Sequence, residues 1–294
     1  MGAGASSAKV ERLDALELAP EVVLSASEFR PLELEARVHV SADTVRLRWT
    51  LPRDGIPGLN VSSCVMVRAT VDGEEVVRPY TPVTGDETPG SMDLVVKVYP
   101  KGKMSRFLAE MPLGEAGAGL VAFKGPMPKL PYVPGEKREV GFICAGSGIT
   151  PCLQVLRAIC RSRTDTTRAS MVFVNRNEVD IICRDELEAL LAEEEAGGGL
   201  RVDAGGGGEG RLRVRLVLTR PPEDGSWKGG AGHLNEAMVR DYLPAPANDV
   251  MMYVCGPPRM MDSLCGPKLP DKSQGPLVGL LKDMGYNEGN VYKF

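Results

Sequence analysis

The sequence predicts two domains, a small antiparallel β-barrel followed by an α/β domain built on a parallel sheet. The chain has 294 residues, which is long for one ordinary domain and enough for two hydrophobic cores. Up to about residue 133, short apolar runs are broken by Gly, Pro and Asp, whereas from residue 139 strand-like and helix-like runs alternate. We therefore expect a flexible tail over 1–29, a barrel domain over 30–134 and an α/β domain over 138–294, with a linker around Tyr132–Lys137.

The barrel should consist of short strands that end at turn residues. The expected strands are Leu34–Val40, Val45–Leu51, Cys64–Val71, Val76–Tyr80, Met92–Tyr99 and Leu120–Lys124. Only Ser105–Met111 has the pattern of a helix in this half of the chain.

The second half should alternate strands and helices around a parallel sheet. The expected strands are Val140–Ala145, Met171–Asn175, Leu212–Thr219 and Val250–Cys255, and the expected helices are Pro151–Cys160, Arg184–Glu195, Leu234–Tyr242 and Pro276–Met284. A sheet of this kind binds ligands beyond the carboxyl ends of its strands. The glycine-rich stretch Gly197–Gly210 is expected to be a surface loop.

The composition excludes several classes of protein. A net charge of -4 gives no reason to expect nucleic acid as a partner. The seven cysteines show neither a CxxC pair nor Cys/His spacing, so a disulfide framework or a metal site is not expected. No apolar run approaches the length of a membrane span, and the first 30 residues lack the apolar core of a secretory signal.

The first six residues fit a myristoylation pattern, in which Gly2 is followed by Ser6 at the required spacing. The alternative is a plain tail of small residues. A single myristoyl chain gives only weak, reversible membrane binding, so any attachment through Gly2 should be marginal.

Two segments of the barrel can bind an anion. Arg78–Val83 places a guanidinium, a phenol and a hydroxyl at a strand end, although the same residues also suit a polar barrel edge. Further on, Lys101–Ser105 forms a glycine turn before a helix, with Ser105 as the expected N-cap. Amide groups at such a helix start suit a pyrophosphate.

Two segments of the α/β domain lie where such a sheet binds ligands. Gly146–Pro151 follows a strand and opens a helix. Thr150 should cap this helix, with Pro151 at the first helical position. The segment suits a dinucleotide phosphate, and a tight structural turn is the alternative. Cys255–Pro258 ends the strand Val250–Cys255, where the thiol either packs or touches a ligand. His39 and His233 have no metal or catalytic partner nearby in sequence and are interpreted as structural.

Taken in order, these segments resemble the ferredoxin-reductase superfamily, and within it the NADH-cytochrome b5 reductases of the plant and fungal mitochondrial type. The resemblance covers about residues 30–294 and includes the tail Gly275–Phe294. The matching blocks are Arg78–Pro82, Val96–Tyr99, Gly102–Ser105, Lys124–Pro126, Gly146–Pro151 and Cys255–Pro258. It implies a flavoprotein that moves a hydride from a nicotinamide onto FAD and then passes single electrons to a protein acceptor.

The resemblance also implies roles for individual residues. Arg78 would bind the FAD pyrophosphate, Tyr80 and Thr81 the ribityl and ring portions, and Lys97 and Tyr99 would line the flavin. The remaining implied FAD residues are Pro79, Pro82, Val96, Gly102, Lys103, Met104, Ser105 and Thr150. The implied nicotinamide-nucleotide residues are Gly146, Gly148, Pro151, Asn175, Thr219, Arg220, Cys255, Gly256, Pro257, Pro258 and Met260. Lys97 and Cys255 are the candidates nearest the reacting rings, although hydride transfer needs no acid or base.

The sequence departs from the family pattern at two places. Family members selective for NADH commonly carry an aspartate after the strand Leu212–Leu218, whereas this chain has Thr219–Pro222 with Arg220. Because a guanidinium pairs with a 2′-phosphate, we hypothesise that NADPH is accepted as well as NADH. The N-terminus shows neither a presequence nor an apolar anchor, which favours a cytoplasmic protein, in contact with a membrane at most through Gly2, over a mitochondrial one.

The expected acceptor is cytochrome b5 or a similar haem protein, and the expected state is a monomer. Lys97, Lys101, Lys103 and Lys124 can steer an acidic acceptor to the flavin edge. The sequence leaves open a ferredoxin-like protein, a nitrate-reducing haem module or a quinone as acceptor. A binding protein that keeps the fold without flavin is the alternative from another class.

Overall fold

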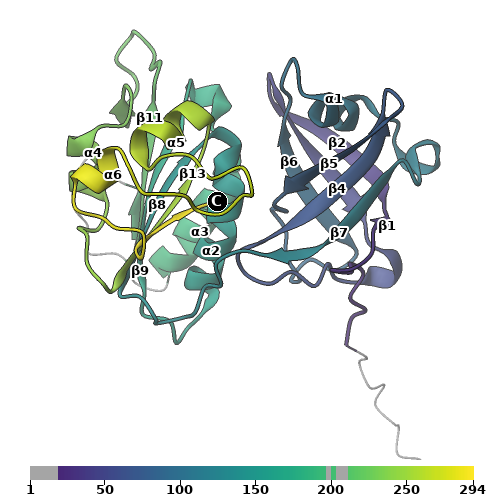
Figure 1. Ribbon diagram of the computed structural model, residues 1–294, viewed down its shortest axis with the longest axis horizontal. Coiled ribbons are helices and arrows are strands. Elements are labelled where there is room, and N and C mark those ends of the chain that lie inside the picture. Colours follow the sequence, from purple (N-terminus) through teal and green to yellow (C-terminus); the bar gives the residue numbers. More distant parts are fainter. Residues whose placement is uncertain (1–18, 197–199, 203–210) are drawn as a thin grey trace, which may run out of the picture.

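The computed structural model describes residues 19–196, 200–202 and 211–294, which form two bodies lying side by side (Figure 1). The first is built from antiparallel strands and the second from a parallel sheet covered by helices, as the sequence predicts. Gly2 and Ser6, together with most of the predicted loop Gly197–Gly210, lie outside the described residues. None of the described helices combines the length and the hydropathy that a membrane crossing requires.

Two antiparallel sheets enclose the core of the first body. One has the strand order β1-β7-β4-β5 and the other β2-β3-β6. Their bounds are β1 Arg30–Pro31, β2 Glu33–Ser41, β3 Thr44–Thr50, β4 Ser63–Val71, β5 Glu74–Tyr80, β6 Ser91–Lys97 and β7 Val121–Pro128, with the helix α1 at Lys103–Glu110.

Alternation along β3 shows why these residues form a half-buried strand. Val45, Leu47 and Trp49 point into the core and are at most 1% exposed. Arg46 and Arg48 point to the other side, as period-two alternation requires. The Trp49 ring meets the edge of Phe123 with 4.7 Å between ring centroids. Burying each such large apolar side chain stabilises the fold by roughly 1.5–3 kcal/mol.

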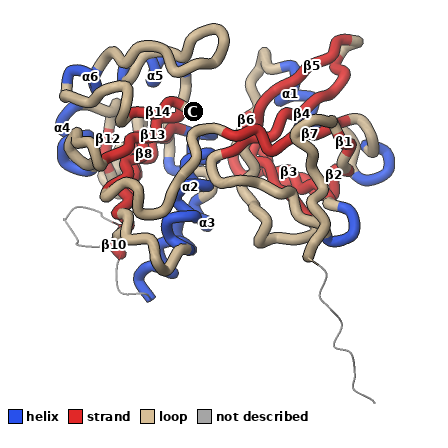
Figure 2. The backbone as a smooth tube through the Cα atoms, turned by 60° about the horizontal axis from the view of Figure 1, so that its bottom comes forward, coloured by secondary structure: helices blue, strands red, loops and turns tan. Residues whose placement is uncertain are grey.

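The second body is a parallel sheet with the strand order β10-β11-β9-β8-β13-β14, and β12 pairs with β11. The strands are β8 Glu139–Ala145, β9 Arg168–Asn175, β10 Leu200–Val202, β11 Leu212–Leu218, β12 Gly230–Ala231, β13 Val250–Cys255 and β14 Val291–Lys293. The helices are α2 Ile149–Arg161, α3 Arg184–Ala196, α4 Glu236–Tyr242, α5 Pro258–Leu264 and α6 Leu280–Asp283. Helices α2 and α3 cover the face toward the barrel, and α4, α5 and α6 cover the other face (Figures 1 and 2).

Several predicted boundaries were wrong. The helix expected over Pro276–Met284 is reduced to α6, because Gly279 and Gly285 on either side have φ angles of 74° and 95°, which no right-handed helix contains. The helix expected from Leu234 begins at Glu236, since Asn235 caps it by accepting the Met238 N–H.

Five of the described helices and strands were missed, including the two-residue strands β1 and β12. The predicted loop Gly197–Gly210 contains strand β10, and neither α5 nor the C-terminal strand β14 was expected. Strand β14 runs parallel to β13 and brings the C-terminus to the side of the sheet that faces the barrel (Figure 1).

The linker between the two bodies is anchored on Asp165, a carboxylate that is only 3% exposed. Its oxygens accept the Tyr132 hydroxyl and the Gly135 and Thr167 N–H groups. None of the seven cysteines is joined in a disulfide. Within the described residues, no group of three or more His, Cys, Asp or Glu side chains is arranged to hold a metal ion.

A buried carboxylate on the face of the sheet opposite the barrel core holds the strands β3 and β6 together. Asp93 is fully buried and accepts hydrogen bonds from Arg46 at 2.7 Å and from Arg48 at 2.9 and 3.0 Å. Burial alone would raise the pKa of Asp93, but the hydrogen bonds and charges of the two arginines hold this pKa below its usual value.

Replacing Asp93 by Asn should lower the free energy of unfolding by about 2–3 kcal/mol at pH 7. This is less than the 3–5 kcal/mol typical of a fully buried pair, because both arginines keep access to water. Since the pKa of Asp93 is lower in the folded state, its stabilisation is present above the unfolded pKa of about 3.9 and is lost as the pH falls through the folded pKa. Urea unfolding between pH 2 and pH 7 should therefore show that the difference in the free energy of unfolding between wild type and Asp93→Asn becomes smaller in acid. The exposed Asp241→Asn variant serves as the control, and a loss that is independent of pH would contradict this account.

Candidate functional site

The segment Arg78–Val83 crosses from the end of β5 into the following loop. Arg78 is exposed, donates only to the Val77 carbonyl at 2.8 Å, and has no carboxylate partner among the described residues. Tyr80 is half-buried, and this burial raises the pKa of its hydroxyl to about 12. The positive charge of Arg78 lowers this pKa, and Tyr99 raises it by a smaller amount. Arg78 and Tyr80 are two residues apart on β5 and therefore lie on the same face of the strand, where an exposed guanidinium stands beside a phenol ring. Thr81 is half-buried, Pro82 is buried and Pro79 is exposed.

Helix α1 packs against β4 and β5, and Lys103 at its start pairs with Glu74 at the beginning of β5, the strand that carries Arg78. The N-cap is Gly102, so the prediction that Ser105 caps the helix was wrong. Ser105 lies inside the first turn, where its hydroxyl accepts the Tyr99 N–H and donates to the Gly102 carbonyl, both at 3.2 Å. A Cβ on Gly102 would come within 2.4 Å of that hydroxyl, so a larger residue would displace the Ser105 side chain. Met104 is buried, and the Lys103 ammonium is paired with Glu74.

The amides at the start of α1 suit an anion. The N–H groups of Lys103, Met104 and Ser105 have no carbonyl one turn back within the helix to receive them. Together with the unpaired Arg78, they form a site whose donors exceed its acceptors. Such a site fits a diphosphate, and the neighbouring Tyr80 and Tyr99 rings fit an aromatic group attached to it.

Lys97 ends β6 and is already paired. Its ammonium donates to both carboxylate oxygens of Asp43, at 2.7 and 2.6 Å. Burial opposes ionisation of Asp43, but the hydrogen bond and charge of Lys97 bring the pKa of this carboxyl below its usual value. Val96 beside it is buried in the barrel core. Strand β6 contacts the turn Gly146–Gly148 of the second body, so the two bodies meet here.

The turn Gly146–Gly148 passes from β8 into α2. Gly146 has a φ of 51° and open space where a Cβ would be, so its backbone is accessible to a ligand. Gly148 lies so close to the end of β13 that a Cβ would come within 2.3 Å of the Cys255 carbonyl oxygen. The structure thus brings the two predicted nucleotide segments together.

The prediction that Thr150 caps α2 was wrong. The helix begins at Ile149, with Gly148 as N-cap and no side-chain cap. Thr150 is buried and its hydroxyl donates back to the Ser147 carbonyl at 3.2 Å. Pro151 is the third residue of the helix rather than the first, a position where its missing N–H costs no helical bond.

Cys255 lies at the carboxyl end of β13, beside Cys144 on β8. Burial raises the pKa of the Cys255 thiol above its usual value, which disfavours the thiolate. Gly256 packs against Met260, whose Cε would lie 2.3 Å from an added Cβ. Pro257 caps α5 and Pro258 is its first residue.

Helix α5 and strand β14 belong to this region and were not predicted, although the sequence contains signals for both. A proline at the first helical position, followed by Met261 and Leu264 at helical spacing, is a sign of α5. The run Val291–Phe294 has the composition of a strand. Its last residue, Phe294, stacks on Tyr253 with 5.4 Å between ring centroids and bonds the Val254 carbonyl, next to Cys255.

Asn175, at the carboxyl end of β9, has an unsatisfied side chain. It is 5% exposed, and neither its amide nitrogen nor its carbonyl oxygen has a hydrogen-bond partner among the residues that the structure describes. Buried polar groups are normally paired, so this side chain is ready to bind a ligand. Its backbone carbonyl accepts the Thr219 N–H at 2.9 Å, which places Thr219 and Arg220 beside it.

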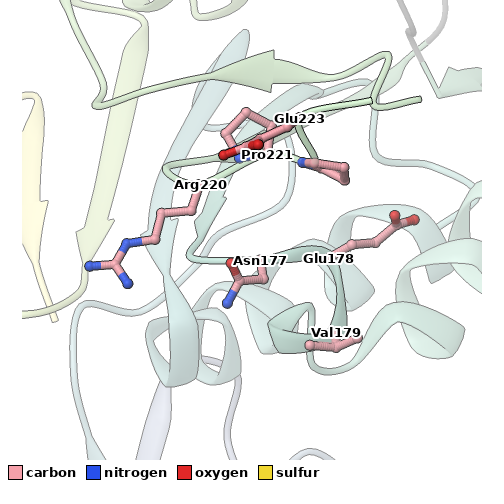
Figure 3. Close-up of a pocket in the computed structure, with 7 residues that line it drawn as sticks. Asn177, Glu178, Val179, Arg220, Pro221 and Glu223 are labelled. Carbon is pink, nitrogen blue, oxygen red and sulfur yellow. The ribbon is translucent and has the colours of Figure 1, made fainter. Parts of the chain in front are cut away.

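A cavity of about 490 Å³ opens beside these residues (Figure 3). Its lining consists of Asn177, Glu178, Val179, Arg220, Pro221, Pro222 and Glu223. Arg220 is exposed and extends away from the Glu178 carboxylate, and no ion pair of Arg220 occurs among the described residues. The cavity therefore combines one guanidinium with two carboxylates.

Family models match both halves of the chain. The oxidoreductase FAD-binding domain matches residues 31–132, and the oxidoreductase NAD-binding domain matches residues 142–266. The donor-rich start of α1 beside Arg78 fits FAD, and the open turn at Gly146 with the unsatisfied Asn175 fits a nicotinamide nucleotide.

Named relatives cover most of the chain. An Arabidopsis thaliana protein described as NADH-cytochrome b5 reductase-like is 35% identical over 284 residues, covering 95% of this chain and 80% of the relative. NADH-cytochrome b5 reductase 2 of Aspergillus clavatus is 36% identical over 266 residues, with 90% and 76% covered. The cytochrome b5 reductase domain of Ulva prolifera nitrate reductase superposes with a TM-score of 0.74 at 29% identity, covering 94% of this chain and all of that domain. By its sequence, its fold and the two halves of its site, this chain belongs to the NADH-cytochrome b5 reductase family of flavin-dependent oxidoreductases.

Proposed function

We propose that this protein takes a hydride from NADH onto FAD and passes single electrons to a haem protein such as cytochrome b5. The observation that supports this proposal is the contact between β6 and the turn Gly146–Gly148. This contact brings a strand of the barrel against the nucleotide turn, and transfer between two stacked rings requires the two bodies to lie this close. FAD, when bound, accepts a two-electron hydride and releases electrons one at a time.

On the flavin side, we assign the diphosphate to Arg78 and to the first turn of α1, Lys103–Ser105. Tyr80 and Thr81 would hold the ribityl chain and ring, while Lys97, Tyr99 and Thr150 flank them. The remaining residues, Pro79, Pro82, Val96 and Gly102, shape the backbone around this site. Because Asp43 already neutralises Lys97, its proposed role is to fix the end of β6 rather than to transfer a proton.

On the nucleotide side, we assign the backbone approach to Gly146, Gly148 and Gly256. Asn175, Thr219 and Arg220 would bind the distal nucleotide, since Asn175 carries the unsatisfied amide, Thr219 bonds its backbone and Arg220 lines the cavity beside it. The remaining residues, Pro151, Cys255, Pro257, Pro258 and Met260, would shape the nicotinamide end. The neutral Cys255 thiol would pack against the nicotinamide and exclude water.

Purified protein should carry FAD, and NADH should bleach its visible absorption without oxygen. Replacing Arg78 by Met should reduce FAD retention by at least tenfold, because a guanidinium–phosphate pair is lost. Arg30→Met is the control, since Arg30 is an exposed barrel arginine that bonds the Val23 carbonyl. A wild-type protein that binds no added FAD would refute the proposal and favour a two-domain binding protein.

We further propose that NADPH is accepted. Arg220 is exposed at the rim of the cavity and without an acidic partner among the described residues, so it is available to a 2′-phosphate. Glu178 and Glu223 in the same lining oppose this charge. We therefore expect the protein to accept NADPH as well as NADH, without a strict preference for NADPH.

The ratio of kcat/KM for NADPH over NADH measures this balance. It should fall at least tenfold in Arg220→Asp, because a carboxylate repels the phosphate. Arg168→Asp, at the opposite end of β9, should leave the ratio unchanged. A wild-type preference for NADH above about a hundredfold, or nearly 3 kcal/mol, would contradict the proposal.

The acceptor site we propose is the lysine-rich edge around the flavin, although fewer of its charges are free than the sequence suggests. Lys97 and Lys103 are paired with Asp43 and Glu74. Lys124 lies over the Phe29 ring at 5.1 Å, and Lys101 is exposed without an ion pair among the described residues. Lys101 and Lys124 therefore remain to attract an acidic haem protein.

The rate of cytochrome b5 reduction should fall several-fold between low and physiological salt, since ions screen surface charges. Lys101→Gln should lower kcat/KM for the cytochrome about two- to threefold at low salt. Lys282→Gln, on α6 at the far end of the second body, should not. Reduction that does not depend on salt would favour a quinone or another uncharged acceptor.

We also propose the remaining features of the protein's organisation. The domain borders are placed at 30–134 and 138–294, and the protein is proposed to act as a monomer. We propose that the protein is cytoplasmic and that acylated Gly2 attaches it weakly to a membrane.

A further inference from the structure

One face of α2 is turned toward the barrel and carries three polar residues at helical spacing. Gln154 accepts the Ser63 N–H at 3.1 Å, Arg157 donates to the Val83 carbonyl, and Arg161 pairs with Glu87 at 2.8 Å. All three partners belong to the barrel. The helix that begins at the nucleotide turn is therefore bonded to the first body along its length.

The hydrogen bond from Arg157 differs from those of Gln154 and Arg161, because its acceptor is the carbonyl of a buried residue in the proposed flavin segment. The Val83 residue it holds is 1% exposed and packs, with Val95, into the core beneath α2 and α3. The Val83 N–H is itself fixed on the Asp93 carbonyl at 2.9 Å. Val83 lies two residues after Thr81, so Arg157 holds the end of the proposed flavin segment.

A second polar link runs parallel to this one. Arg46 on β3 bonds Asp93 on β6 and also pairs with Glu186 on α3. The Glu186 side chain is 14% exposed, which makes this ion pair partly shielded from water. Glu87 and Glu186 favour the charge of Arg157, whereas burial and Arg161 oppose it.

We infer that Arg157, assisted by the Arg46–Glu186 pair, is a positioning residue that fixes the nucleotide turn relative to the flavin segment. This inference rests on the proposed hydride transfer. Arg157 touches neither proposed cofactor site directly. It acts through Val83 on one side and through α2, which starts beside Gly148, on the other.

Replacing Arg157 by Met tests this role. The limiting rate of anaerobic flavin reduction at saturating NADH should fall by about 10- to 100-fold, since an error near 1 Å in the alignment of reacting groups costs this much. The Kd for NAD+ and the FAD content should stay within about threefold of wild type. Arg157→Lys should recover part of the rate, because an ammonium can still donate one bond to Val83.

Arg161→Met is the matched control on the same helix face. Its ion pair with Glu87 also joins the two bodies, but both side chains are at least 40% exposed, so the limiting rate should change less than twofold. If Arg157→Met does not fold, Glu186→Gln removes the second link without altering the barrel core and should slow reduction by a smaller factor.

A measurement without any cofactor separates this inference from the proposed function. In FAD-free protein, amide hydrogen exchange over residues 81–87 should be faster in Arg157→Met than in wild type and unchanged in Arg161→Met. Wild-type exchange and wild-type reduction rates in Arg157→Met would overturn the positioning role. Equal losses of rate, FAD content and NAD+ affinity would overturn it too, because they indicate general destabilisation. If NADH fails to reduce the wild type, the proposed function fails, and the exchange comparison still decides the role of Arg157.

Discussion

The buried carboxylate of Asp93 is the interaction on which the arrangement of the two bodies depends. Its side chain joins Arg46 and Arg48 of β3, and its backbone holds Val83 and the hydroxyl of Thr84. Arg46 continues to α3, and Val83 is bonded by α2. A charge buried without partners is costly, so these contacts form together or not at all.

The site follows from this arrangement because each half of it is incomplete alone. The barrel supplies an unpaired guanidinium and the free amides of α1, while the sheet supplies the turn at Gly146 and the end of β13. The close approach of Gly148 to the Cys255 carbonyl joins the two nucleotide segments, and only a residue without a side chain allows it. The Tyr132 and Gly135 bonds to Asp165 limit the freedom of the linker, so the two halves face each other in one orientation.

The fold class and most strands could be predicted because alternating and continuous apolar runs leave little choice of structure. The caps could not. Ser105 and Thr150 both have the residue type of a cap, yet each hydroxyl bonds backbone inside the first turn, since the chain enters both helices through a glycine. Helix α6 is short for a related reason, because glycines with positive φ bracket it.

The sequence by itself determined the order of the motifs, the two-body architecture and the family, because these depend on residue types and local spacing. Tertiary structure alone decided which charges are free. Lys97 and Lys103 are neutralised by Asp43 and Glu74, residues 54 and 29 positions away, whereas Arg78 and Arg220 meet no carboxylate in the described part of the chain. Ion pairs between residues so distant in sequence form only when the sheets bring them together, and no local pattern contains that information.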